Sequence, residues 1–215
     1  MDIDALFSYS PLWFLFKGFL GDVLVAVFRP LPLVLPLAMI VMFAAMYARE
    51  HGWTSRDSVS QATRAWKSAF TGSAVFRIEF FLVLYVMLVM SRTMLFRPTH
   101  PHPLSDMLGG WDFYDINGDF TLEAVENFIL FIPFGLLLSS VLHKAEQAEG
   151  RSAGARVLRR VILASAVFSL AIEFLQVMLY VGTFQFADLF YNTAGGAFGA
   201  LLLLCLHAKI RAMRA

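Results

Sequence analysis

The sequence predicts an all-α fold: a polytopic membrane helix bundle of about five transmembrane helices, with one further helix near the N-terminus lying on the membrane surface. Hydrophobic residues make up 59% of the 215-residue chain and charged residues only 15%, whereas a soluble domain contains about 25% charged residues. Apolar runs near the length of a bilayer crossing recur five times. We therefore interpret residues 1–215 as a single integral membrane domain.

Each predicted span follows from an apolar run and its interruptions. Pro30 and Pro36 in the first run predict a kink or a late start near Leu31. The third run is short for a full crossing, and Pro133 inside it predicts a broken or tilted helix. The aromatic stretch 12–21 carries Lys17 and is interpreted as an interfacial helix, although a sixth span stays open. In chain order the five spans are about 24–48, 76–96, 127–142, 157–181 and 187–207.

The charges of the predicted loops fix an expected orientation. Basic residues gather in about 49–77, 144–160 and 209–214, whereas 99–126 carries six acidic residues and no Lys or Arg. The loops of membrane proteins that lie in the cytoplasm are enriched in Lys and Arg. The sequence therefore predicts a multi-pass protein of the cell membrane with its N-terminus outside and its C-terminus in the cytoplasm.

Polar residues in the fourth and fifth spans recur at helical spacing. Residues three and four apart share one face of a helix, so each span is expected to carry a single polar stripe. The short connection between the two spans makes them antiparallel neighbours, and their stripes can face each other. The first stripe is Ser165, Ser169, Glu173 and Gln176, and the second is Asp188, Asn192, Gly195 and Gly199. Gly195 and Gly199 also form a small-xxx-small pattern that favours close helix packing.

These residues predict a polar pocket in the outward half of the membrane. Glu173 is expected about 12 Å below the outer end of its helix, at 1.5 Å per residue, while Asn127 and Asp188 begin helices on that side. The candidate ligand-binding residues are Asn127, Glu173, Gln176, Asp188 and Asn192. No catalytic residue, metal site or cofactor is predicted.

A structural role competes with this interpretation. Polar residues in membrane bundles often join helices, at about 0.6 kcal/mol each, and Asn127 or Asp188 can stabilise a helix N-terminus. Glu173 is harder to explain in this way, because a charged residue at the bilayer centre costs at least about 2.5 kcal/mol on insertion scales. Its own helix offers no Lys or Arg at the same depth. The side chain is therefore either protonated or partnered by a cation or donor from elsewhere.

Three blocks of sequence are similar to the VanZ-like family. The motif N-x-x-x-F-x-P-x-G matches Asn127 to Gly135, the motif E-x-x-Q matches Glu173 to Gln176, and the motif D-x-x-x-N-T-x-G matches Asp188 to Gly195. The resemblance covers about 127–203, with the order and spacing of the blocks intact. It implies a membrane protein of a family named for low-level teicoplanin resistance.

One position departs from the family pattern. The family commonly has a Gly-Arg pair shortly after the E-x-x-Q block, and here Gly182 is followed by Thr183. If that arginine partners the glutamate or an anionic ligand, this chain either binds something different or uses another cation.

Three functions stay open at this point. The first is a non-enzymatic protein whose outward-facing pocket binds a lipid-linked envelope precursor or another amphiphile and so alters resistance to glycopeptides such as teicoplanin. The second is a membrane enzyme acting on such a precursor, with Glu173 as general acid or base and Asp188 as its partner. The third is a small transporter. The expected partner is the lipid bilayer and not nucleic acid, and self-association through the glycine-rich fifth span stays open.

Overall fold

Helices are the only regular secondary structure in the described part of the chain, in agreement with the predicted all-α fold class. The computed structural model describes residues 21, 24–25, 28–51, 59–95, 99–111, 121–148 and 154–213. Its helices are α3 (Leu31–His51), α4 (Val59–Gly72), α5 (Ala74–Met94), α6 (Glu123–Ala148), α7 (Gly154–Leu179) and α8 (Phe186–Ala212). Five of them, all except α4, are long and apolar enough to cross a membrane, which fits a multi-pass membrane protein. The interfacial helix predicted over 12–21 falls outside the described residues, apart from Gly21.

Two prolines lie at the first span: Pro30 directly precedes it and Pro36 lies inside it. Helix α3 begins at Leu31, directly after Pro30, at the position where the sequence predicted a late start. The carbonyl of Pro30 accepts hydrogen bonds from the N–H groups of Leu33 and Val34, each at 3.0 Å.

The third span is longer than the sequence predicted. We expected a short, broken or tilted helix over about 127–142, but α6 runs unbroken for 26 residues and contains Pro133. Its first turn carries Glu123 and Glu126, where carboxylates are favoured by the positive end of the helix dipole. The backbone N–H of Glu123 also donates to Thr121 Oγ1 at 3.2 Å. The helix therefore begins among charged residues that a search for apolar runs assigns to a loop.

Helix α4 was not predicted, because the residues around it were interpreted as a basic loop. Its aromatic face packs on α5: the Trp66 ring stacks on Phe70 with centroids 5.2 Å apart and meets Phe80 edge-on at 6.2 Å. The guanidinium of Arg77 on α5 donates to the carbonyls of Phe70 and Thr71, both at 3.0 Å. Because the last carbonyls of a helix lack partners within it, these bonds fix the corner between α4 and α5.

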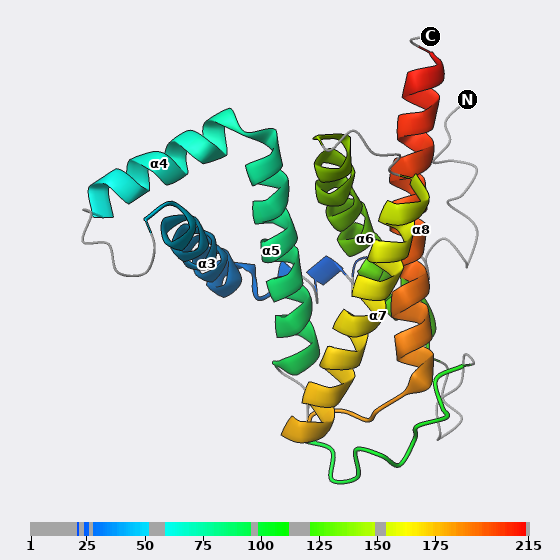
Figure 1. Ribbon diagram of the computed structural model, residues 1–215. Helices are drawn as coiled ribbons and strands as arrows, with labels where there is room; N and C mark the ends of the chain where they lie inside the picture. The colour runs from blue at the N-terminus through cyan, green and yellow to red at the C-terminus, as the bar shows by residue number, and fades with distance from the viewer. Residues whose placement is uncertain are drawn as a thin grey trace, which may run out of the picture.

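Helix α6 lies at the centre of the contacts and packs on α5, α7 and α8, while α3 packs on α5. Glycines allow α8 to approach it closely: an added Cβ at Gly195 would clash with the carbonyl of Phe128, and one at Gly199 with that of Ile132. The glycine face of α8 is thus occupied within the chain. In Figure 1, α4 lies at the upper left, and the 99–111 segment lies at the bottom with the α7–α8 connection.

Candidate functional site

Residues 99–111, called the cap segment below, lie along the connection between α7 and α8. The N–H of His100 donates to the Tyr180 carbonyl at 2.6 Å, and the N–H of Phe184 donates to the Pro103 carbonyl at 2.8 Å. At its far end, the ring of Trp111 packs against Phe190 with centroids 5.6 Å apart. The cap segment therefore closes one end of the bundle, called the capped end.

Helix α7 ends in a turn that directs the chain straight into α8. Tyr180 has a positive φ of 55°, the left-handed conformation that commonly ends a helix. The N–H of Val181 donates to the Gln176 carbonyl at 3.0 Å, and that of Tyr180 to the Val177 carbonyl at 3.3 Å. This pair of bonds is a Schellman motif. It leaves a short connection and places the polar faces of α7 and α8 beside each other near the capped end.

Glu173 lies within this arrangement and is almost completely buried, with 1% of its surface exposed. It is six residues, or about 9 Å, before the end of α7. Its Oε2 accepts a hydrogen bond from the backbone N–H of Gln185 at 2.9 Å. Because Gln185 immediately precedes α8, the carboxylate ties α7 to the start of the next helix.

Gln185 extends the same contact to the cap segment. Its Nε2 donates to Asp106 Oδ2 at 2.6 Å, so one residue links the Glu173 carboxylate to that of Asp106. Gly110 lies against this side chain with φ +79°, and a Cβ there would be 2.7 Å from Gln185 Oε1. Neither Asp106 nor Gln185 was among the predicted binding residues. The sequence indicates both residues only weakly. Gln185 is a single polar residue three positions before Asp188, and Asp106 is one of six acidic residues in 99–126.

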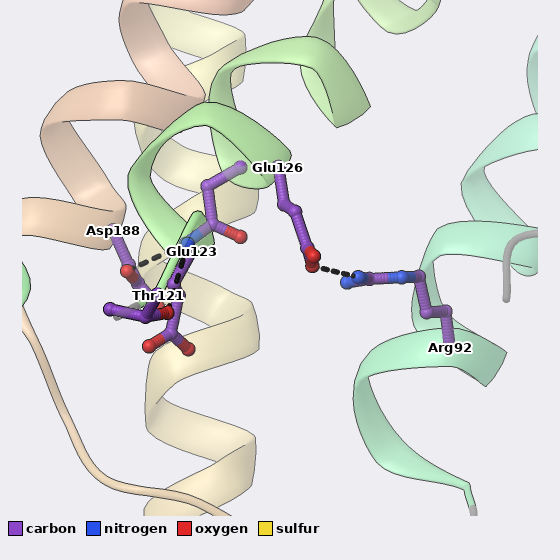
Figure 2. Close-up of polar contacts among 6 residues, drawn as sticks. Arg92, Thr121, Glu123, Glu126 and Asp188 are labelled. Carbon is purple, nitrogen blue, oxygen red and sulfur yellow. Dashed lines mark hydrogen bonds and ion pairs between the residues drawn. The ribbon is translucent and has the colours of Figure 1, made fainter. Parts of the chain in front are cut away.

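Asn127 and Asp188, two of the predicted residues, are joined directly by a hydrogen bond. Asn127 Nδ2 on the first turns of α6 donates to Asp188 Oδ1 on the first turn of α8 at 2.6 Å. Figure 2 shows Asp188 beside the start of α6, with Glu126 on the other side of that helix. The start of α6 is thereby joined to the start of α8.

The other two predicted residues bond outside the predicted set. Gln176 Nε2 donates to the backbone carbonyl of Thr93 on α5 at 3.1 Å. Asn192 Nδ2 donates to Ser169 Oγ at 2.9 Å and joins α8 to α7. All of these contacts lie in the half of the bundle nearer the cap segment. We call the seven residues Asp106, Asn127, Glu173, Gln176, Gln185, Asp188 and Asn192 the polar cluster.

Several buried polar atoms in and beside the polar cluster have no hydrogen-bond partner within the described ranges. They are Gln185 Oε1, Asn192 Oδ1, Ser165 Oγ and Thr193 Oγ1. A buried polar group without a partner costs about 1–3 kcal/mol, and native proteins contain few of them. These atoms therefore have hydrogen-bonding capacity left for a water molecule or for the polar group of a ligand.

Arg92 places a cation next to the polar cluster. It lies in the last turn of α5, and its Nη2 is 2.7 Å from Glu126 Oε2 on α6, as Figure 2 shows. Its side chain is 14% exposed, and its Nε is buried without a hydrogen-bond partner among the residues described. Next to this ion pair in sequence, the Thr93 carbonyl accepts a hydrogen bond from Gln176, and Asn127 itself belongs to the polar cluster. Sequence reasoning passed over this arginine, although an arginine inside an apolar span is itself unusual.

The family model described as VanZ/LLP1 matches residues 37–207, a range that begins within α3 and ends within α8. It contains the motif-based resemblance over about 127–203 and extends it towards the N-terminus. No match was found among the curated proteins or among the solved structures.

Proposed function

Because the chain belongs to the VanZ/LLP1 family, we propose that it is a non-enzymatic cell-membrane protein that binds the polar part of an envelope lipid or amphiphile in its polar cluster. The ligand is a lipid-linked envelope precursor or a glycopeptide with an acyl tail. Its binding contributes to resistance to teicoplanin. The capped end faces outside, where such ligands are found.

The burial of Glu173 is the observation that carries this proposal. A carboxylate inside a span costs about 2.5 kcal/mol or more, and Glu173 is buried where α7 meets the start of α8, with a hydrogen bond to the Gln185 backbone among its contacts. A glutamine carbonyl would join the same two helices. The position of this buried carboxylate beside several unsatisfied polar atoms supports a role in recognising a ligand.

Arg92 supports an anionic group on that ligand. Thr183 stands where the family commonly has an arginine, and Arg92 offers a cation from α5 at the same end of the bundle. Glu126 holds one side of its guanidinium at 2.7 Å, which leaves the buried Nε to donate to a further acceptor. Phosphate oxygens suit this geometry, because guanidinium groups bind phosphate through several N–H donors.

The distribution of charge supports the proposed orientation. The cap segment contains no Lys or Arg. Basic residues gather at the other end of the bundle, including Lys67 on α4, Arg160 on α7 and Lys209 on α8.

The orientation is tested with a membrane-impermeant thiol reagent on intact cells, in a variant in which Cys205 is replaced by Ser. A cysteine at Ser105, which is exposed in the cap segment, should be labelled, and one at Lys209 should not; the reverse pattern contradicts the orientation.

The function is tested by comparing Glu173→Gln with Glu79→Gln, which changes a carboxylate in α5 near the opposite end of the bundle. With both proteins inserted at equal levels, Glu173→Gln should remove the resistance to teicoplanin and weaken binding of a lipid-linked wall precursor in detergent. Glu79→Gln should retain both. Susceptibility to a glycopeptide without an acyl tail serves as the reference. If Glu173→Gln leaves both resistance and precursor binding unchanged, the proposal is wrong.

A further inference from the structure

A second feature lies at the end of the molecule away from the cap segment. A pocket of about 500 Å³ lies between α3 and α4. Its lining residues are Met39, Ile40 and Phe43 of α3 and Thr63, Trp66 and Lys67 of α4. Apart from Thr63 and Lys67, its walls are apolar side chains. No residue of the polar cluster lines it, so it forms a separate site.

The walls of this pocket face outward from the bundle. Met39 is 43% exposed and Ile40 is 62% exposed, and both belong to a helix long and apolar enough to span a membrane. In a bilayer such side chains meet acyl chains rather than water. An acyl chain therefore suits the pocket, and the lipid headgroup is selected by the residues at its rim.

Helix α4 gives the pocket a basic rim. It is 14 residues long, and it carries aromatic side chains on the face that packs on α5 and exposed Arg64 and Lys67 elsewhere. Short helices of this kind lie at membrane interfaces, where their basic residues favour anionic lipids. Lys67 lines the pocket itself, and its side chain is exposed and has no salt-bridge partner within the described residues.

The site is held in place before any lipid arrives. The Trp66 ring is fixed by its stacking on Phe70 and its edge contacts with Phe76 and Phe80. Arg77 holds the end of α4 through two hydrogen bonds. A pre-formed site binds more tightly than one that must be ordered on binding.

We propose that this pocket binds one acyl chain of an anionic phospholipid, with the lipid phosphate against the ammonium group of Lys67. The lipid lies in the leaflet at the basic end of the molecule, opposite the capped end. It would hold α3 against α4 at the membrane interface. The proposal does not depend on what the polar cluster binds.

The test uses Trp66 as a reporter of the lipid beside it. The variant Trp13→Phe, Trp53→Phe, Trp111→Phe leaves Trp66 as the sole tryptophan. It is placed in vesicles that contain phosphatidylglycerol and phosphatidylcholine, with bromine on the acyl chains of one lipid at a time. Brominated phosphatidylglycerol should quench Trp66 more than brominated phosphatidylcholine at the same mole fraction, and high salt should reduce this excess.

Lys67→Ala in the same background should lower the relative affinity for phosphatidylglycerol about fivefold, which corresponds to about 1 kcal/mol per basic residue at an anionic surface. Lys209→Ala, which removes another exposed lysine at the same end, should leave it unchanged. Circular dichroism confirms that each variant is folded, and native mass spectrometry of the unmodified chain should show one retained phosphatidylglycerol. Equal quenching by the two lipids indicates a non-selective contact and overturns the proposal, as does an equal effect of the two lysine substitutions.

Discussion

Two substitutions at Glu173 separate its role in ligand binding from its role in helix packing. Glu173→Ala removes a hydrogen-bond acceptor, whereas Glu173→Gln removes only the charge. Glu173→Ala removes the acceptor of the Gln185 N–H bond at 2.9 Å. Gln185 is only 7% exposed, so its N–H group is left without an acceptor at a cost of about 1–3 kcal/mol. Glu173→Gln keeps a carbonyl at the same position, and we expect the free energy of unfolding to change by less than about 1 kcal/mol.

Thermal unfolding in detergent micelles measures the difference. A loss of 1 kcal/mol lowers Tm by about 2–4 °C in a chain of this length, so a loss of about 2 kcal/mol for Glu173→Ala predicts a decrease of about 4–8 °C. Glu173→Gln should unfold within about 4 °C of the unmodified chain. Glu79→Ala is the control, since Glu79 makes no hydrogen bond in the part of the chain that the structure describes, and it should shift Tm little.

Two results would refute this reasoning. If Glu173→Ala unfolds at the temperature of the unmodified chain, the bond to Gln185 does not stabilise the bundle. If Glu173→Gln is as unstable as Glu173→Ala, the charge itself holds the helices together. A glutamine at this position then does not replace the carboxylate in packing.

Three further predictions concern other contacts. Gly195→Ala, whose new Cβ would clash with the Phe128 carbonyl, should destabilise the protein by about 1–3 kcal/mol in detergent unfolding. Gly154→Ala, where the space is open, should not, and equal effects would show that close α6–α8 packing is unimportant. Asp106→Ala removes the 2.6 Å hydrogen bond to Gln185 and should increase hydrogen exchange in residues 100–111. Ser105→Ala is the control and should leave exchange unchanged. Unaltered exchange in Asp106→Ala would mean that this bond does not hold the cap segment in place. Arg92→Ala should weaken binding of a phosphate-bearing precursor by about 10-fold or more and Arg92→Lys by less, and unchanged affinity in Arg92→Ala would exclude Arg92 from ligand binding.

Much of the fold could be predicted because membrane-spanning helices are recognisable as long runs of apolar residues. The apolar runs located five helices, since a bilayer requires about 20 apolar residues per crossing. The same criterion failed at charged helix ends, and for this reason α6 was predicted too short at both Glu123 and Lys144. It also failed for α4, whose aromatic face covers α5 while its other side carries polar and basic residues.

Helical spacing found the candidate residues of α7 and α8, including Asn192 and its partner Ser169, but it did not find Gln185 and Asp106. Spacing places Glu173 and Gln176 on one face of α7 and Asp188 and Asn192 on one face of α8, whatever the loops do. Gln185 and Asp106 lie outside the helices, where no period relates one residue to the next. Their contact depends on how the cap segment folds over the α7–α8 connection, which is a tertiary property that spacing does not encode.

Photochemical cross-linking tests the central claim, that the polar cluster binds the polar part of a membrane ligand, most directly. A lipid-linked wall precursor with a diazirine in its headgroup is irradiated with the protein in vesicles, and the modified residues are identified by mass spectrometry. We predict adducts on the segments that contain Asp106, Asn127 and Gln185, and their loss in Glu173→Gln. Adducts confined to lipid-facing residues of α7 such as Leu170 and Phe174, which are 48% and 61% exposed, would contradict the account.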